Sequence, residues 1–442
     1  MIDSKQFQSF TDTTVIPTKT QNNQLKKLVK YAKKHSPRIA ALYKNIGVEF
    51  TLQDLPVTNK QLIMEDFDNW TTASDFTLKE LKDFTTDPNN AGEKFKQKYS
   101  VCKTSGSTGS PFYMAYNPTE SEFMTKSMNA CMASKALLLG PSVFLFPLKQ
   151  HMISICSIKK SQRKYPLMKK YLILQDSTVS TQEIINRLNE IQPKILVTYA
   201  SSAELLASEQ IKGSLRLNLK DIVVSGETLS AKTRDYIQNA FQCRVRSIYA
   251  CTEAGGIALE CKCNHLHLHN PGLILEPVDE HNDPVPMGQT AHKLLVTVLY
   301  QKTVPLIRYE INDRVIVHNT PCPCKKHSPW IEIEGRSALS PFIFRTKDGE
   351  VSIFILALLF TVEGIDGVRR IQIILHGYDR LECRVDFMEG ADENNTFEKI
   401  KNIFAECFEQ NKIENIQIYL SHQKPQIDSQ TGKFVKAYQI FQ

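Results

Sequence analysis

The pattern that most constrains the fold lies between residues 180 and 250, where helical and strand-like segments alternate. A capping box at Ser180 to Glu183 opens an amphipathic helix, which ends at Pro193. After it come a strand at 195–199, a helix opened by a second capping box at Ser201 to Glu204, a strand at 222–224, a helix at 231–241 and a strand at 245–249. This alternation predicts βαβ units and a parallel sheet, whose functional loops lie at the carboxyl ends of the strands.

The segments on either side of this region predict the domain organisation. A Lys-rich amphipathic helix is expected at 25–35, with a short helix after it. Alternating apolar segments predict strands at 293–299, 315–318, 330–333, 370–375, 381–387 and 416–420. The apolar run at 353–360 predicts either a helix or a strand. We therefore expect an α/β protein. A large N-terminal domain, residues 1–335, would hold mixed and parallel sheets with helices and a β-rich subdomain, and residues 336–442 would form a small α+β domain.

Composition excludes several classes of protein. With 442 residues, 42% hydrophobic and 23% charged, the chain has the composition of a folded protein of two or three domains. The net charge of +7 suits anionic ligands such as nucleotides, and the lysines are too dispersed for a nucleic-acid surface. The start lacks an apolar signal-peptide core, and the longest apolar run, 351–362, is too short to span a bilayer. We expect a cytoplasmic protein without a membrane span.

The segment from Lys103 to Pro111 reads KTSGSTGSP. Its small residues and two glycines let the backbone approach an anion, and its N–H groups and hydroxyls can surround phosphate oxygens. The spacing differs from that of a Walker A loop. In isolation, a flexible Ser/Gly surface turn is an equally good interpretation.

Other motifs favour the phosphate interpretation. Tyr249 to Glu253 follows a predicted strand, which puts a carboxylate where magnesium bound to nucleotide phosphates could be held. The segment 305–313 supplies Arg308 and Asp313, and the aspartate can accept hydrogen bonds from ribose hydroxyls. Gly335-Arg336 lies at the expected domain boundary, between Gly335 and Pro341, and Gly432-Lys433 lies near the C-terminus.

In this order the motifs resemble those of the adenylate-forming enzyme superfamily, and within it the phenylacetate-CoA ligase and CapK-like branch. The segments 35–37 and 55–60 resemble the N-terminal region of that branch, and Ser225-Gly226-Glu227 resembles its nucleotide-contacting turn. The resemblance extends over nearly the whole chain. It implies ATP, magnesium and coenzyme A as ligands, a small-molecule carboxylic acid as substrate, and a homodimer as a common assembly.

The resemblance also implies roles for individual residues. The β- and γ-phosphates would be held by Thr104, Ser105, Gly106, Ser107, Thr108 and Gly109. The adenine pocket would be lined by Ser225, Gly226 and Glu227, with Tyr249 near the base. Thr252 and Glu253 would contact the α-phosphate and magnesium, and Asp313 would bind the ribose hydroxyls. Arg336 would lie at the ribose and the hinge. Lys433 would be the catalytic lysine, carried by a mobile C-terminal domain.

The implied reaction is attack of a carboxylate on the α-phosphorus of ATP, which releases pyrophosphate, and then transfer of the acyl group to coenzyme A. The transition state gathers negative charge that an ammonium, hydroxyls and magnesium can stabilise. Two alternatives remain: transfer to an amine, alcohol or protein thiol, and a non-catalytic nucleotide-binding interaction protein. Ser110 and Ala250 depart from the residues common in relatives, Lys and Gly, and the hinge residue after Gly335-Arg336 is not obvious.

A second cluster of residues predicts a metal site. Residues 260–269 read ECKCNHLHLH, and Cys322-Pro323-Cys324 follows about sixty residues later. Thiolates and imidazoles suit tetrahedral zinc, although reduced thiols and surface histidines near a turn are an alternative. Relatives with a similar set imply the ligands Cys261, His267, Cys322 and Cys324, and Cys263 or His265 could replace one of them. Four protein ligands would make the zinc structural, not catalytic.

Overall fold

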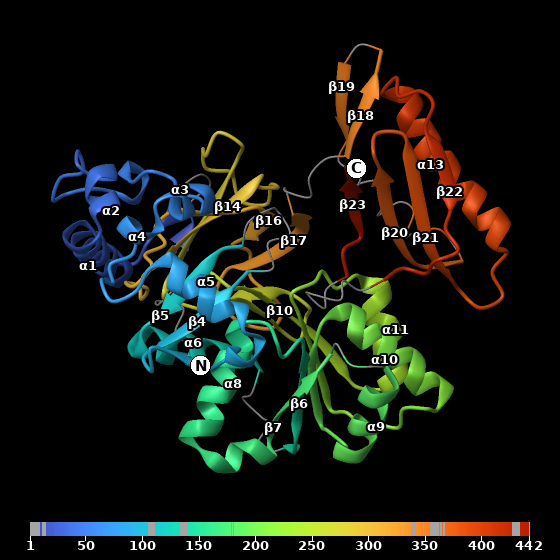
Figure 1. Cartoon of the computed structure of the whole chain (residues 1–442), viewed down its shortest axis with the longest axis horizontal. Helices are drawn as coiled ribbons and strands as arrows, with labels where there is room; N and C mark the ends of the chain where they lie inside the picture. Colours follow the sequence, from blue (N-terminus) through green and yellow to red (C-terminus); the bar gives the residue numbers. More distant parts are fainter. Residues whose placement is uncertain are drawn as a thin grey trace. The chain divides into compact units, whose positions relative to one another are not determined.

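The computed structural model describes residues 9–10, 15–104, 111–132, 139–177, 179, 181–336, 342–347, 349–353, 362, 365, 367–426 and 434–441. The chain divides into two compact units, Met1–Ser337 and Ala338–Gln442, which we call unit 1 and unit 2 (Figure 1). No helix in the described part of the chain is long and apolar enough to cross a membrane.

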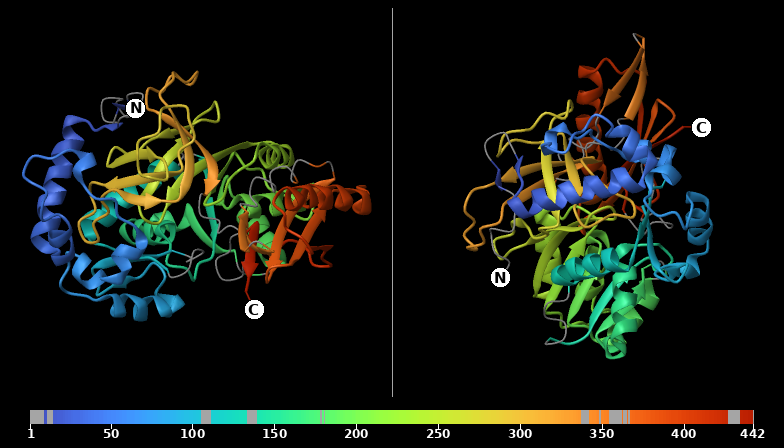
Figure 2. Two further views of the ribbon diagram at one scale, coloured as in Figure 1. Left: turned by 90° about the horizontal axis from the view of Figure 1, so that it is seen from above. Right: turned by 90° about the vertical axis from the view of Figure 1, so that its left-hand side faces the viewer.

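Unit 1 begins with a small hairpin, β1 (Ser9–Phe10) and β2 (Val15–Ile16), and a group of helices. The helices are α1 (Lys19–His35), α2 (Pro37–Leu42), α3 (Lys60–Glu65), α4 (Phe67–Trp70) and α5 (Leu78–Thr86), with the 3-10 helices η2 (Leu52–Asp54) and η3 (Pro88–Asn90). The long α1 runs beside β13 (Leu273–Val278), and its buried Gln21 amide donates hydrogen bonds to Pro271 O and Leu273 O (Figure 2).

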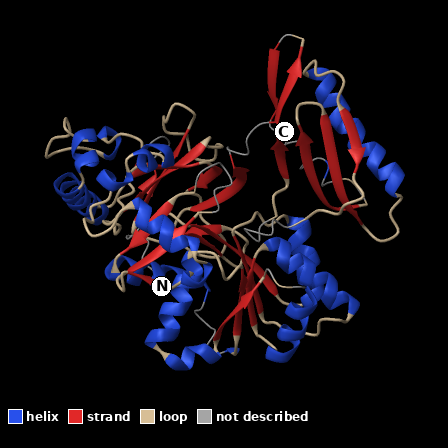
Figure 3. Ribbon diagram, in the orientation of Figure 1, coloured by secondary structure: helices blue, strands red, loops and turns tan. Residues whose placement is uncertain are grey.

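A nine-stranded sheet forms the centre of unit 1 (Figure 3). Its parallel half consists of β7 (Leu172–Asp176), β6 (Ser142–Phe146), β8 (Ile195–Thr198), β9 (Asp221–Ser225) and β10 (Arg244–Cys251), in that spatial order. The antiparallel half continues with β11 (Gly255–Glu260), β12 (Leu266–Leu268), β17 (Trp330–Arg336) and β16 (Asp313–His318). The βαβ pattern predicted from the sequence is confirmed.

Helices cover both faces of the parallel half. They are α6 (Pro118–Met132), α8 (Ile153–Lys164), α9 (Thr181–Ile191), α10 (Ala200–Lys212) and α11 (Ala231–Phe241), and the 3-10 helix η4 (Pro166–Lys170) connects α8 to β7. Side chains along a strand alternate between two cores: Ile222 and Val224 pack with α9, α10 and α11, whereas Val223 packs in the larger core on the opposite face. Burial on both faces explains the nearly continuous apolar runs of these strands.

One predicted helix start is wrong. The sequence predicts that a capping box at Ser201 to Glu204 opens a helix, but α10 begins at Ala200, and its N-cap residue, Tyr199, makes no side-chain cap hydrogen bond. The Ser201 hydroxyl instead donates to the Glu227 carboxylate at 2.9 Å. A tertiary acceptor has replaced the local one, and sequence spacing cannot reveal that.

Two small sheets complete unit 1. One contains β3 (Lys94–Phe95), β4 (Tyr99–Lys103) and β5 (Tyr113–Tyr116), and the other β13, β14 (Lys293–Val298) and β15 (Tyr309–Ile311). The strands expected at 293–299, 315–318 and 330–333 all form, but β14 belongs to the small sheet, whereas β16 and β17 extend the central one.

Unit 2 has an α+β fold, as expected. Its four-stranded sheet has the order β22 (Gln417–Leu420), β21 (Arg380–Phe387), β20 (Val368–His376) and β23 (Ala437–Ile440), beside a hairpin of β18 (Phe342–Thr346) and β19 (Gly349–Ile353). Helix α13 (Glu393–Gln410) packs Ile400, Phe404 and Phe408 into a core with the sheet. The apolar run expected at 353–360 lies outside the described residues after Ile353.

Candidate functional site

The carboxyl ends of β9 and β8 meet at one edge of the sheet, as expected for neighbouring parallel strands. The turn Ser225-Gly226-Glu227 follows β9, and Gly226 has φ +79°, a conformation that favours glycine. The Glu227 carboxylate accepts hydrogen bonds from the Ser201 N–H at 2.8 Å and the Ser201 hydroxyl at 2.9 Å. These bonds fix the turn to the first residues of α10.

Tyr249 and Asp313 form a buried pair at the end of β10. The Tyr249 hydroxyl donates to Asp313 Oδ2 at 2.7 Å, and each residue is 7% exposed. Asp313 opens β16, where its register partner on β17 is Arg336. The structure thus brings together three of the predicted site positions, which are up to 87 residues apart in the chain. The Arg336 side chain lies outside what the structure describes.

The turn that contains Thr252 and Glu253 leads directly out of β10. The hydroxyl of Tyr116, on β5, donates to the carbonyl oxygen of Thr252 at 2.6 Å. The Glu253 charge acts on two groups from other segments. Burial lowers the pKa of Lys60 while Glu253 opposes that shift, and burial together with Glu253 raises the pKa of Tyr309. The carboxylate therefore lies where segments from three parts of unit 1 converge.

The predicted phosphate loop connects β4 to β5. Thr104 is described: its N–H donates to Phe112 O at 3.0 Å, and its hydroxyl accepts from the Phe112 N–H at 2.8 Å. Ser105, Gly106, Ser107, Thr108 and Gly109 lie outside the described residues. The hairpin holds the two ends of the loop together. Phe112 also stacks on Tyr309 with ring centroids 5.5 Å apart, which links the loop to the segment before Asp313.

Sequence reasoning missed the residues that assemble this site. Tyr116, Phe112 and Thr58 each connect two motifs; the Thr58 N–H donates to Arg308 O at 3.0 Å, and its hydroxyl donates to Ile307 O at 2.9 Å. Arg308 itself is buried, has φ +47°, and pairs with Glu276 at 3.1 Å. It supports the chain here, and no sequence signal distinguishes that role from a ligand contact.

Lys433 lies outside the described residues, but both ends of its segment are described. In unit 2 the Gln372 side chain, on β20, donates to Gln426 O at 3.1 Å and to Val435 O at 2.9 Å, and it accepts from the Gln426 N–H at 3.1 Å. The Arg370 guanidinium lies 5.1 Å from the centre of the Phe434 ring. Two side chains of one strand therefore hold both ends of segment 427–433.

His151 follows β6 at the same edge of the sheet as the candidate site. It is 4% exposed, and neither ring nitrogen has a hydrogen-bond partner among the described residues. Burial lowers its pKa to about 4, so the folded protein holds a neutral imidazole. Its carbonyl oxygen accepts from the Lys103 N–H at 2.9 Å, next to the phosphate loop. From the sequence alone, His151 had no identifiable partner and no predicted role.

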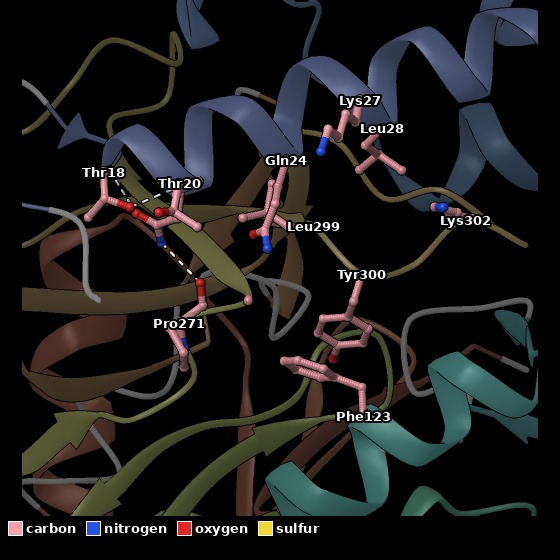
Figure 4. Close-up of a pocket in the computed structure, with 12 residues that line it drawn as sticks. Thr18, Thr20, Gln24, Lys27, Leu28, Phe123, Pro271, Leu299, Tyr300 and Lys302 are labelled. Carbon is pink, nitrogen blue, oxygen red and sulfur yellow. Dashed lines mark hydrogen bonds between the residues drawn. The ribbon is translucent and has the colours of Figure 1, made fainter. Parts of the chain in front are cut away.

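A pocket of about 440 Å³ opens between α1, α6 and the turn after β14 (Figure 4). One wall is an aromatic pair, Phe123 and Tyr300, with ring centroids 4.1 Å apart. The Tyr300 hydroxyl donates to Ala254 O at 3.1 Å, immediately after Glu253. Gly272 leaves the space that this pair needs, because a Cβ at Gly272 would lie 2.8 Å from Tyr300 Cδ1.

The predicted metal ligands converge in the antiparallel half of the sheet. Potential ligand atoms of Cys261, His267, Cys322 and Cys324 all lie within 4.8 Å of one another. They come from β12 and from the turns β11–β12 and β16–β17. The Cys261 and Cys322 sulfurs are 3.8 Å apart, and Cys324 Sγ lies 3.4 Å from His267 Nε2. We call these four residues the Cys/His cluster.

The surroundings of the Cys/His cluster suit a metal. His267 Nδ1 donates to Ser328 O at 2.8 Å, which leaves Nε2, the nitrogen that faces Cys324, with a free lone pair. Main-chain N–H groups of Cys263 and Lys326 donate to the sulfurs of Cys261 and Cys324. The alternative ligands lie close to this group: His265 Nδ1 is 3.2 Å from Cys322 Sγ, and the His265 ring stacks on Trp330 at 4.0 Å.

No family model matches the chain. Protein CapK from Staphylococcus aureus is 27% identical over 222 residues, 49% of this chain and 47% of CapK, so the match spans about half of that protein. Among solved structures, 2-hydroxyisobutyryl-CoA ligase in the postadenylation state with 2-HIB-AMP aligns over 96% of this chain and 89% of its own, with a TM-score of 0.69 and 17% identity. The anthranilate CoA ligase AuaEII with anthranoyl-AMP covers 76% of this chain and 64% of its own, with a TM-score of 0.50 and 14% identity.

These comparisons confirm the resemblance at the level of fold. The chain has the fold of an adenylate-forming CoA ligase, with a large α/β unit followed by a small α+β unit, and it is similar in sequence to CapK. Because the sequence identities to the solved structures are low, this likeness is evidence for the fold alone.

Proposed function

We propose that this chain is an ATP-dependent, AMP-forming acid–thiol ligase. It would convert a small carboxylic acid into an acyl-adenylate with release of pyrophosphate and then transfer the acyl group to coenzyme A. The observation that carries the proposal is the buried Tyr249–Asp313 pair beside the Thr252–Glu253 turn, at the carboxyl end of the parallel strands. In open α/β sheets that edge is where ligands bind.

The pair suits a ribose. A carboxylate can accept hydrogen bonds from two ribose hydroxyls, and the 2.7 Å bond from Tyr249 fixes Asp313 before a nucleotide arrives. Glu253 supplies an oxygen ligand of the kind magnesium takes, and the bond from Tyr116 to Thr252 O sets the direction of that turn. Ser225, Gly226 and Glu227 follow the adjacent strand and would line the adenine pocket.

The chemistry requires little beyond position and charge. The substrate carboxylate oxygen would form a bond to the α-phosphorus while the bond to the pyrophosphate oxygen breaks. No general base is needed because the nucleophile is already an anion. Donors from Thr104 and the loop after it, with Lys433, would stabilise the charge that develops on the phosphate oxygens. The thiol sulfur of coenzyme A would then attack the acyl carbon, and AMP leaves.

We also propose that the Cys/His cluster holds a structural zinc ion. Three thiolates and one imidazole form a complete tetrahedral set, and the hydrogen bond from His267 to Ser328 O orients the imidazole as a ligand. Three of the four residues are buried, which suits a site closed to substrate. The ion would join two hairpin turns of one sheet.

The test is ATP–pyrophosphate exchange with purified protein, magnesium and pools of carboxylic acids. We expect exchange that depends on one pool and that Glu253→Ala abolishes. Lys79→Ala, an exposed change on α5, is the matched control and should exchange at the wild-type rate. Absence of exchange with every pool, in protein that binds magnesium-ATP, would contradict the ligase and favour the non-catalytic alternative.

A further inference from the structure

The last turns of α8 and the 3-10 helix η4 after it form a basic segment with protruding apolar side chains. Residues 159–170 contain six cationic side chains and no acidic one. They are Lys159, Lys160, Arg163, Lys164, Lys169 and Lys170. Two carboxylates from other elements approach them: Glu93 pairs with Lys159 and Arg163, and Glu122 pairs with Lys160 and Lys164. Six cations therefore face two anions, which leaves a local excess of positive charge.

Two large apolar residues project from the middle of this segment. Tyr165 is 56% exposed and Leu167 is 61% exposed, whereas Met168, between Leu167 and Lys169, packs against the main core of unit 1. The Lys164 ammonium lies 5.4 Å from the centre of the Tyr165 ring. None of the η4 residues is buried, and Lys169 and Lys170 are both exposed. The core thus anchors the turn through Met168 and presents Tyr165 and Leu167 to the outside.

The position of the segment separates it from the candidate active site. It immediately precedes the amino end of β7, an edge strand parallel to β6 (Figure 1). The candidate site lies at the carboxyl ends of β8, β9 and β10 in the same parallel half. The η4 part of the segment, which carries Leu167, Lys169 and Lys170, therefore lies at the opposite end of the strands from the candidate site.

We propose that residues 159–170 form a docking surface for an anionic lipid bilayer. Lysines and arginines near the surface would be attracted by anionic headgroups, while Tyr165 and Leu167 would enter the interfacial layer of the membrane. A soluble polyanion satisfies only the charges and leaves the two apolar side chains in water. The exposed Tyr165 and Leu167 between lysines therefore favour a lipid bilayer over a soluble polyanion as the binding partner.

The test is co-sedimentation of the full chain with lipid vesicles. We expect binding to phosphatidylcholine vesicles that contain a third of phosphatidylglycerol, no binding to phosphatidylcholine alone, and weaker binding at high salt because exposed charges are screened. Lys169→Gln with Lys170→Gln should weaken binding about 30-fold, and Leu167→Ser about tenfold. Trp fluorescence and circular dichroism would verify that each variant is folded.

Matched controls come from equally exposed positions elsewhere in unit 1. Ile211, on α10, is 61% exposed like Leu167, and Lys79 and Lys82, on α5, are exposed lysines. Ile211→Ser and the Lys79→Gln/Lys82→Gln pair should bind vesicles as the wild type does. All variants should keep wild-type ATP–pyrophosphate exchange, so failure of the docking proposal and failure of the ligase proposal are distinguishable.

Three outcomes would overturn the proposal. The first is absence of binding to anionic vesicles. The second is equal loss of binding in the Lys79/Lys82 pair, which would assign the effect to total charge. The third is binding that needs Lys169 and Lys170 but is unchanged in Leu167→Ser and is matched by a soluble polyanion, which would assign the surface to an acidic partner.

Discussion

The candidate nucleotide site joins the end of β10 to the start of β16, whereas the Cys/His cluster lies wholly in the antiparallel half of the sheet, and the two sites use their polar groups differently. At the nucleotide site the Tyr249 hydroxyl donates to Asp313 Oδ2, and a carboxylate can accept more than one hydrogen bond. In the Cys/His cluster four ligand atoms face one another within 4.8 Å. The first arrangement suits a substrate that enters and leaves; the second suits an ion that stays.

The comparison indicates how each site should respond to mutation. Changes in the nucleotide site that keep the packing, such as Asp313→Asn, should reduce activity while the fold is retained, because they remove a charge and leave the apolar core intact. Changes in the Cys/His cluster should reduce stability first, because metal binding is coupled to folding. Trp70 and Trp330, the two tryptophans of the chain, both lie in unit 1, so their fluorescence reports the unfolding of that unit.

The largest expected effect is on the adenylation half-reaction. Lys433→Ala should slow ATP–pyrophosphate exchange about 10³-fold or more, since it removes the cation that would stabilise the transition state. Transfer from supplied acyl-adenylate to coenzyme A should stay near the wild-type rate. Equal loss of both half-reactions would contradict the assignment of Lys433 to adenylation alone.

Asp313→Asn should have the next largest effect, about 100-fold on exchange at low ATP concentration, because a charged acceptor becomes neutral. The melting temperature should change little, since the amide oxygen can still accept from Tyr249. Tyr249→Phe and the double variant complete a cycle that measures the coupling of the pair. Asp313→Asn with normal exchange would remove the ribose role.

Cys322→Ser should act on stability. We expect zinc content measured by atomic emission to fall together with the melting temperature of unit 1, by about 5 °C or more. Cys263→Ser is the matched control, since Cys263 is in the same region but outside the four-residue group. An unchanged zinc content in Cys322→Ser would exclude this ligand set and remove the contrast between the two sites.

The smallest effect concerns His151 and pH. Its pKa of about 4 lies below the ordinary 6.5, so the unfolded chain binds an extra proton between these values. The free energy of unfolding of unit 1 should therefore have its highest contribution from His151 above pH 6.5. That contribution should decrease toward pH 4 by at most ~1.4 kcal/mol per pH unit.

His151→Phe should flatten that slope in urea unfolding followed by Trp fluorescence. His281→Gln, a change at an exposed histidine, is the control and should leave the slope unchanged. A slope that is unchanged in His151→Phe would show that folding does not lower the pKa of His151.

Much of the fold could be predicted because its signals are local. The helices and apolar strands from 180 to 250 depend on neighbours within a turn or a strand, so hydrophobic period was sufficient to place them, while the Ser180 capping box lies outside the described residues. Ser201 was the exception, since its partner is Glu227 on another segment. Strand order and the division of β14, β16 and β17 between two sheets depend on pairing across the fold, which periodicity does not encode.

By itself the sequence determined the residue types and the order of the motifs, and with them the resemblance and the four residues of the Cys/His cluster. Only the tertiary structure decided that the ligand atoms of those four residues lie within 4.8 Å of one another, that Arg308 is held by Glu276, and that Tyr249 reaches Asp313. The physical reason is that these contacts join residues far apart in the chain. Their geometry is set by the packing of strands and helices between them, and a linear pattern contains no measure of that distance.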